Sequence, residues 1–148
     1  MTSAPYIKPL PSPSPASRGF WEAARRHQLV LQRCRSCRRH IHYPRSVCPH
    51  CLLQDLEWAP ASGRGTVYTY TVARRPTSSL FADVAPYVIA IVELEEGVRM
   101  TTNIVGCSPD DVRIGMPVQV AFDDVTDEVT LVKFRPVGAS QPIEKDNH

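Results

Sequence analysis

The chain has 148 residues, of which 43% are apolar and 22% charged, and its formal net charge is +2. This composition is typical of a globular protein, and the length allows one ordinary domain or a small metal module followed by a small domain. No apolar run approaches membrane-spanning length, and the N-terminus lacks the apolar core of a signal peptide. We therefore expect a cytoplasmic protein without a membrane partner.

The charge is unevenly distributed. Residues 1–58 hold nine Lys/Arg and three Asp/Glu, a formal +6, whereas residues 59–148 hold eight and twelve, a formal −4. Such a basic region indicates an anionic partner: nucleic acid, a phosphorylated cofactor or an acidic protein face. The alternative is a solvated surface that offsets an anionic metal centre. Most of this basic charge comes from Arg18, Arg25, Arg26, Arg33, Arg35, Arg38, Arg39 and Arg45.

The first segment of the chain is rich in proline. Residues 1–17 contain five prolines, which forbid helix and favour an extended chain. We expect either a disordered tail or an arm that orders on a partner. A short amphipathic helix follows over residues 19–28, and its Phe20 and Trp21 pack either on the chain's own core or on another subunit. A strand over residues 29–33 leads into the first cysteine turn.

Four cysteines stand at Cys34, Cys37, Cys48 and Cys51. Each Cys-x-x-Cys pair places two sulfurs on one turn, and two facing turns supply the tetrahedral set that Zn²⁺ prefers in closed structural sites. Four protein ligands leave no open position, so this metal should stabilise the fold rather than catalyse. We expect Trp58 to cover the module.

Other interpretations of these cysteines are weaker. Disulfides would need an oxidising compartment, and rubredoxin-type iron remains open on ligand identity although the ten-residue gap is short for it. We interpret His27, His40, His42 and His50 as surface or packing residues. Cys107 is the remaining cysteine, and we interpret it as a small half-buried residue rather than a catalytic thiol.

From Gly63 onward the pattern becomes that of strands. Alternating or continuous apolar runs occur at residues 63–75, 86–97, 98–107, 117–125 and 128–136, with a hairpin predicted at residues 95–97. Five short strands without long helices predict a small β-barrel, and their number fits the OB-fold. The fold class is therefore mainly β: a short helix and rubredoxin-like zinc ribbon followed by a five-stranded OB-fold barrel. We place the proline-rich arm at 1–17, the helix and ribbon at 18–60, the OB-fold at 61–137 and a tail at 138–148.

A zinc ribbon joined to an OB barrel first indicates nucleic-acid binding, which requires basic residues and aromatic stacking platforms. Tyr68, Tyr70, Arg74 and Arg75 are the main such residues on a barrel that is otherwise net acidic. No credible active site is visible either, because nucleophilic catalysis needs a base near the nucleophile and the barrel contains no histidine. We interpret the acidic pairs Asp123–Asp124 and Glu95–Glu96 as solvated turns. We predict no catalytic residue.

Several motifs together carry a family resemblance. F-W-E precedes the ribbon, Y-P-R precedes the second cysteine pair, S-G-R-G-T-V opens the barrel, and I-G-M-P-V follows. In this order, over roughly residues 19–136, they resemble the Zn-ribbon domain-containing OB-fold family. Members often carry glycine after a cysteine pair. This chain has Arg38 and Leu52, and we expect the departure to affect the turn geometry more than metal binding.

The resemblance implies a non-catalytic accessory subunit of an acyl-CoA-processing complex, since relatives accompany thiolase-fold aldolases, thiolases and acyltransferases. It implies carbon–carbon bond cleavage or formation, such as thiolysis or retro-aldol of an acyl-CoA, in lipid or steroid metabolism. The expected assembly is a hetero-oligomer, such as a heterotetramer, with a thiolase-like enzyme that shares a CoA thioester with this chain. The CoA-binding residues stay unassigned. Two alternatives remain: a partner of a hot-dog-fold enoyl-CoA hydratase, and a stand-alone OB-fold binder of single-stranded nucleic acid.

Overall fold

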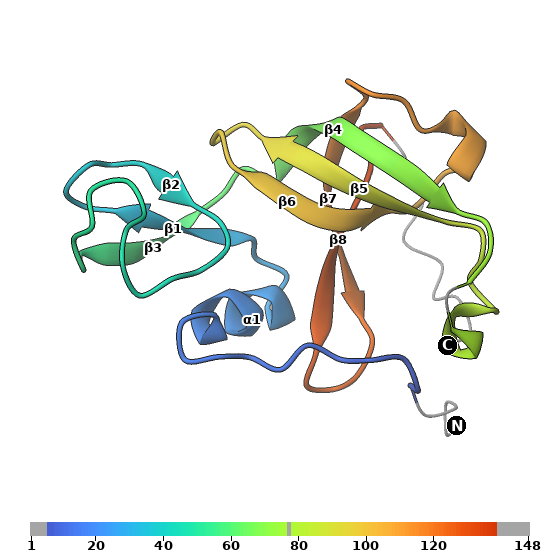
Figure 1. Cartoon of the computed structure of the whole chain (residues 1–148), viewed down its shortest axis with the longest axis horizontal. Helices are drawn as coiled ribbons and strands as arrows, with labels where there is room; N and C mark the ends of the chain where they lie inside the picture. Colours follow the sequence, from blue (N-terminus) through green and yellow to red (C-terminus); the bar gives the residue numbers. More distant parts are fainter. Residues whose placement is uncertain (1–5, 77, 139–148) are drawn as a thin grey trace.

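The computed structural model describes residues 6–76 and 78–138 and contains two β units with one α-helix beside them (Figure 1). None of the helices in these residues has the length and apolar composition needed to cross a membrane. The elements are α1 (Arg18–Arg25), β1 (Val30–Cys34), β2 (His40–Ile41), β3 (Leu56–Pro60), β4 (Arg64–Ala73), η1 (Ser79–Phe81), β5 (Tyr87–Leu94), β6 (Arg99–Ile104), η2 (Pro109–Asp111), β7 (Pro117–Asp124) and β8 (Thr130–Pro136).

Helix α1 forms because Phe20, Ala23 and Ala24 fall on one face, which is buried. It ends earlier than the sequence predicts. His27 adopts a left-handed conformation with φ +57°, and its backbone N–H donates to the carbonyl of Ala24. This tight C-terminal turn redirects the chain into β1, so the helix stops at Arg25 instead of continuing to residue 28.

The ribbon is a three-stranded antiparallel sheet in the order β2-β1-β3, at one end of the molecule (Figure 1). Its central strand β1 ends in Cys34, which lies opposite Leu56 of β3. Leu56 packs on the cysteine cluster. The prediction that Trp58 covers this module is wrong: its indole lies against Gly19 of α1, where an added Cβ would come within 2.5 Å of the ring. Trp58 therefore joins the ribbon to the helix.

The barrel is closed by five strands in the order β4-β5-β6-β8-β7, with β7 pairing back to β4. Residues 95–97 form the predicted hairpin, in which Leu94 and Val98 share a backbone hydrogen bond of 2.9 Å. Gly65 is required in β4 because a side chain there would collide with the Glu93 carbonyl of β5. The predicted fold class is confirmed: a short helix and a zinc ribbon followed by a five-stranded OB-like barrel.

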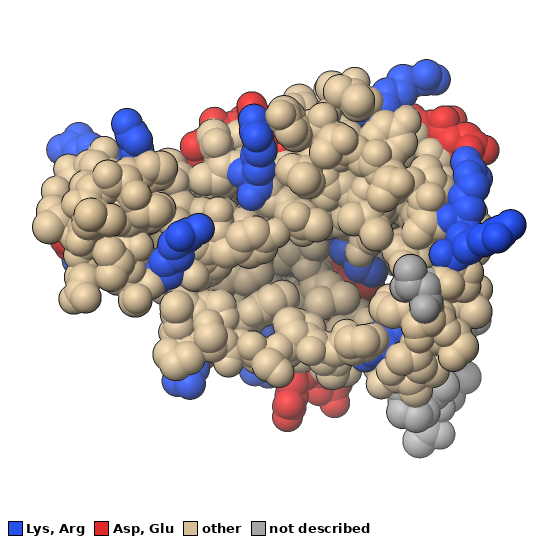
Figure 2. All heavy atoms as spheres, viewed as in Figure 1, with Lys and Arg blue, Asp and Glu red and all other residues tan. Residues whose placement is uncertain are grey.

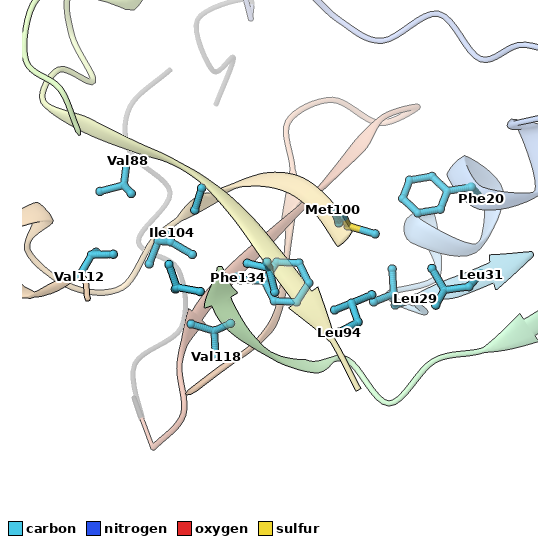
Figure 3. Close-up of a cluster of buried hydrophobic side chains, with 13 residues drawn as sticks. Phe20, Leu29, Leu31, Val88, Leu94, Met100, Ile104, Val112, Val118 and Phe134 are labelled. Carbon is cyan, nitrogen blue, oxygen red and sulfur yellow. The ribbon is translucent and has the colours of Figure 1, made fainter. Parts of the chain in front are cut away.

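One core fills the barrel and extends to the helix. Phe134 is fully buried at its centre, and α1 places Phe20 near Met100 of β6 (Figure 3). Leu29, just before β1, and Leu31 belong to the same cluster of buried side chains. The helix and the first ribbon strand therefore contribute directly to the apolar interior of the barrel.

The described part of the proline-rich arm, residues 6–17, contains neither helix nor strand. It nevertheless contacts its own barrel: Lys8 is buried, and its Nζ lies 3.3 Å from Asp83 Oδ2. Ser14 and Ser17 exchange hydrogen bonds immediately before α1. The arm thus has an intramolecular contact that its composition does not predict. Residues 1–5 of the arm, and all of the predicted tail except Gly138, lie outside the described residues.

Candidate metal centre and the surrounding surface

The two cysteine turns bring four sulfur atoms together. The Sγ atoms of Cys34 and Cys51 are 3.5 Å apart, those of Cys37 and Cys48 are 3.7 Å apart, and all four lie within 4.8 Å of one another. A tetrahedral zinc with Zn–S bonds of about 2.3 Å requires sulfur–sulfur separations of about 3.8 Å. The thiol set therefore fits a structural metal of this kind.

Both turns keep a left-handed residue after the cysteine pair. Arg38 has φ +64° and Leu52 has φ +66°, and their N–H groups donate to the carbonyls of Cys34 and Cys48 at 2.7 and 2.9 Å. A side chain in this region costs free energy that glycine avoids. We expected the absence of glycine to disturb these turns, but Arg38 and Leu52 both adopt the left-handed conformation that favours glycine.

Backbone amides and burial set the proton affinity of the thiols. Burial raises the pKa of the Cys48 thiol, but hydrogen bonds from the backbone amides of Cys51 and His50 and from the neighbouring thiols lower it by more, to about 6. The His50 amide nitrogen lies 3.4 Å from the Cys48 sulfur. For Cys51 the Leu53 amide lowers the pKa, whereas burial and the neighbouring sulfurs raise it more, to about 11. Four adjacent thiols cannot all ionise without a cation, and a bound metal would displace their protons.

The histidines lie outside the sulfur cluster. Among the described residues, the potential ligand group holds only the four cysteines. His42 packs between the rings of Phe20 and Tyr43, and burial lowers its pKa to about 4. His27 stacks on Phe122 with ring centroids 5.1 Å apart and lies 2.9 Å from the Asp124 carboxylate. These two are packing residues, as predicted.

Cys107 is half-buried, in agreement with the sequence interpretation. Burial, followed by the charge of Asp111, raises the pKa of its thiol. A protonated thiol is a poor nucleophile, so this environment is the opposite of that around an activated cysteine. That the chain carries no catalytic residue nevertheless stays a prediction.

The two acidic pairs differ: Glu95–Glu96 lies in the β5–β6 turn with Glu95 exposed, as predicted, whereas Asp123–Asp124 lies in strand β7. Asp123 is 4% exposed and its carboxylate lies 2.6 Å from Lys133 Nζ, which corrects the interpretation from sequence. Glu95 accepts two hydrogen bonds from Arg64, and Glu96 accepts one from the Ser62 backbone. These carboxylates tie neighbouring strands and turns together.

The surface around the ribbon is basic, as the sequence predicts. On the face shown in Figure 2, Lys and Arg side chains predominate over the ribbon end. Of the barrel residues considered as a stacking platform, Tyr68 and Tyr70 are exposed, and the Arg99 guanidinium lies 3.8 Å from the centre of the Tyr68 ring. Arg74 instead pairs with Asp110 at 3.1 Å.

Comparisons with known proteins match both units. Residues 21–57 match the family described as ChsH2, rubredoxin-like zinc ribbon domain, and residues 58–123 match ChsH2, C-terminal OB-fold domain. A DUF35 domain-containing scaffold protein of Methanothermobacter thermautotrophicus is 42% identical over 104 residues, covering 70% of this chain and 77% of the relative. The chain belongs to the DUF35 family. The family resemblance stated from sequence is thereby confirmed.

Two further relatives carry functional names. This DUF35 chain is similar to a chain of the solved Ltp2-ChsH2(DUF35) aldolase, with a TM-score of 0.78 and 42% identity, covering 86% of this chain and 98% of that one. A probable enoyl-CoA hydratase alpha subunit of Thermomonospora curvata is 42% identical over 130 residues, which is 88% of this chain. The chain spans only 40% of the length of that relative.

Proposed function

We propose that this DUF35 protein is a non-catalytic accessory subunit of an acyl-CoA-processing complex with a thiolase-fold partner. The observation that carries the proposal is its similarity to the DUF35 chain of the Ltp2-ChsH2 aldolase, which extends over 98% of that chain. The partner would cleave or form a carbon–carbon bond of an acyl-CoA, and this chain would help build the acyl-CoA site. The assembly would be a hetero-oligomer.

We further propose that Cys34, Cys37, Cys48 and Cys51 hold one structural Zn²⁺. Sulfur–sulfur distances of 3.5 and 3.7 Å within the cluster support this set. The ion would be closed off by four protein ligands, and it would hold the two cysteine turns of the basic ribbon together. The chemistry at the acyl-CoA would be left to residues of the partner.

Co-purification with thiolase-fold proteins encoded beside this chain, followed by mass spectrometry, tests the partner. We expect a stable hetero-oligomer whose turnover of acyl-CoA thioesters needs both subunits. Cys107→Ala should leave that turnover unchanged, because its protonated thiol has no assigned role. Turnover by the purified single chain that is lost in Cys107→Ala would contradict the proposal.

The second candidate is a subunit of an enoyl-CoA hydratase, favoured by the 42% identity to the Thermomonospora curvata alpha subunit. Hydration of an enoyl-CoA by a co-purified hot-dog-fold partner, without carbon–carbon bond chemistry, would select this alternative. A stand-alone single-stranded nucleic-acid binder is favoured by the exposed Tyr68–Arg99 pair and by the basic ribbon. Strongly salt-dependent binding of an oligonucleotide would indicate that function.

A further inference from the structure

The tips of the two cysteine turns carry large side chains where the backbone favours glycine. Arg38 and Leu52 have φ of +64° and +66°, and each follows a cysteine pair in a turn closed by its own backbone N–H. Glycine adopts this conformation without steric cost, whereas a residue with a Cβ is strained there. Strain of this kind persists where the side chain has a use that offsets its cost.

Neither of these side chains is used inside the fold. Leu52 is 74% exposed and belongs to neither cluster of buried side chains. Arg38 is exposed, and within the described part of the chain its side chain has no hydrogen bond or ion pair. His27, which is also left-handed, differs because its ring stacks on Phe122 and bonds the Asp124 carboxylate. Contacts within the fold thus offset the strain at the end of α1, but among the described residues they do not offset it at the cysteine turns.

The two turn tips form one surface. Cys37 and Cys48, one from each turn, have their Sγ atoms 3.7 Å apart, and Arg39 Nη1 lies 3.2 Å from His50 Nδ1 across the same junction. The ribbon lies at one end of the molecule, and the end of β1 that carries the first cysteine is the one farther from the barrel (Figure 1). We name this surface the knuckle face, and its exposed residues are Arg38, Arg39, His50, Leu52 and Leu53.

The knuckle face is cationic around its two leucines. Residues 30–60, which form the ribbon, hold five arginines and two acidic residues. Those two, Asp55 and Glu57, both pair with Arg35, at 3.4 and 3.2 Å. Inside the ribbon, backbone amides donate to two of the sulfur atoms, and they would offset part of the charge of a metal-bound thiolate set. Within the described residues, the guanidinium groups of the knuckle face therefore have no carboxylate partner.

We propose that the knuckle face is a docking surface for a protein whose contact region is a small apolar pocket ringed by carboxylates. Leu52 and Leu53 enter the pocket, and Arg38 and Arg39 pair with the carboxylates, because interfaces combine an apolar centre with a polar rim. A protein fits better than nucleic acid, since the centre of the face is aliphatic and bases stack on aromatic rings. The chemistry of the occupant follows from the knuckle face, and the inference rests on the proposed function only for the identity of the protein, the enzyme subunit.

Titration calorimetry between the zinc-loaded full chain and the enzyme subunit with which it co-purifies tests the knuckle face. Arg38→Gly combined with Leu52→Gly should weaken binding at least about tenfold, because it removes the apolar centre and one cation of the rim. Since glycine fits both φ values, the thermal midpoint and the zinc content of the isolated variant should not fall. A purely structural role would lower these two quantities together with the affinity. Added salt should weaken the unmodified chain more than Arg38→Gly, because it screens the rim contacts.

The matched control is Arg113→Ala combined with Ile114→Ala, which removes the same kinds of exposed side chain from the barrel and should bind like the unmodified chain. An affinity of the glycine variant within about twofold of the unmodified chain would overturn the inference, and so would equal losses in variant and control. Binding to anionic phospholipid vesicles that is lost in Leu52→Gly would also overturn it, by assigning the face to a membrane surface. A complex of unchanged affinity would refute only the knuckle face. A missing complex would refute the proposed function and, with it, the enzyme subunit as occupant.

Discussion

The ribbon and the barrel are stabilised in different ways. The buried cluster of the ribbon consists of Cys34, Ile41 and Cys48, with Leu56 packed against it, so two of its three buried members are potential metal ligands. The barrel cluster holds 13 buried side chains around the fully buried Phe134. We expect a unit with so little apolar core to need a metal to stay folded, whereas a closed barrel does not. Under the proposed function, metal-dependent and apolar stabilisation would coexist within one chain.

The two regions are nevertheless joined. Phe20, Leu29 and Leu31 precede the cysteine turns in the sequence, yet they pack in the barrel cluster. Trp58 of β3 lies on α1. Unfolding of the ribbon should therefore destabilise one side of the barrel through α1 and β1. A destabilising substitution deep in the barrel should affect the metal centre less.

Removing a metal ligand should have the largest effect. Cys34→Ser should reduce zinc from about one ion per chain to almost none and unfold the ribbon, because metal binding is coupled to folding. Elemental analysis measures the zinc, and hydrogen exchange should show loss of protection in β1–β3 with the barrel strands still protected. Ser36→Ala, in the same turn, is the control. A metal-free Cys34→Ser variant with normal ribbon protection would show that the ribbon does not depend on the metal.

Phe134→Ala should destabilise the barrel by about 3–5 kcal/mol, because it removes a fully buried aromatic side chain. Urea unfolding followed by circular dichroism measures this loss. Zinc content below the unfolding transition should stay at one per chain, which would sharpen the contrast between the two regions. Val137→Ala, at a position that is 53% exposed, should change stability by less than about 0.5 kcal/mol. Zinc release in Phe134→Ala in the same transition as barrel unfolding would show that the two regions unfold as a single cooperative unit.

Gly19→Ala tests the junction between α1 and the ribbon. The new methyl would lie within 2.5 Å of the Trp58 ring, and such overpacking should cost about 1–2 kcal/mol despite the better helix propensity of alanine. Thermal unfolding measures the change. Combining it with Trp58→Val should remove the penalty, because the clash disappears. If Gly19→Ala lowered stability equally in the Trp58→Val background, the effect would come from the backbone and not from a clash with the indole.

His42 should give an effect that appears only in acid. Burial lowers its pKa to about 4 in the folded chain, below the ordinary value of 6.5. The unfolded state therefore binds the proton first as pH falls from 6.5 to 4, and about 3 kcal/mol of the stability present above pH 6.5 is lost across this window. Chemical unfolding at several pH values, compared with His42→Gln at equal zinc occupancy, isolates the contribution. If the free energy of unfolding of the unmodified chain and of His42→Gln changed equally with pH, His42 would not be the group responsible.

Local patterns in the sequence were enough to predict the short helix, strand β1 and the five barrel strands, but not the ribbon strands β2 and β3. The two Cys-x-x-Cys pairs predicted facing turns, alternating apolar runs predicted the barrel strands, and Glu95–Gly97 predicted the β5–β6 hairpin. These features depend on residues a few positions apart, so spacing alone carries the information. The ordered motifs also predicted the family, which the comparisons confirm.

The contacts between distant segments were decided only by the tertiary structure. Spacing does not reveal that Trp58 meets Gly19, that Asp123 is buried beside Lys133, or that His27 contacts Asp124 from 97 positions away in the sequence. The sequence by itself determined the barrel strands, the hairpin and the cysteine turns, because their periodicity and spacing are local. Which side chains share a contact was decided by strand pairing and by the packing of helix, ribbon and barrel on one another, since these bring together residues whose separation along the chain carries no signal.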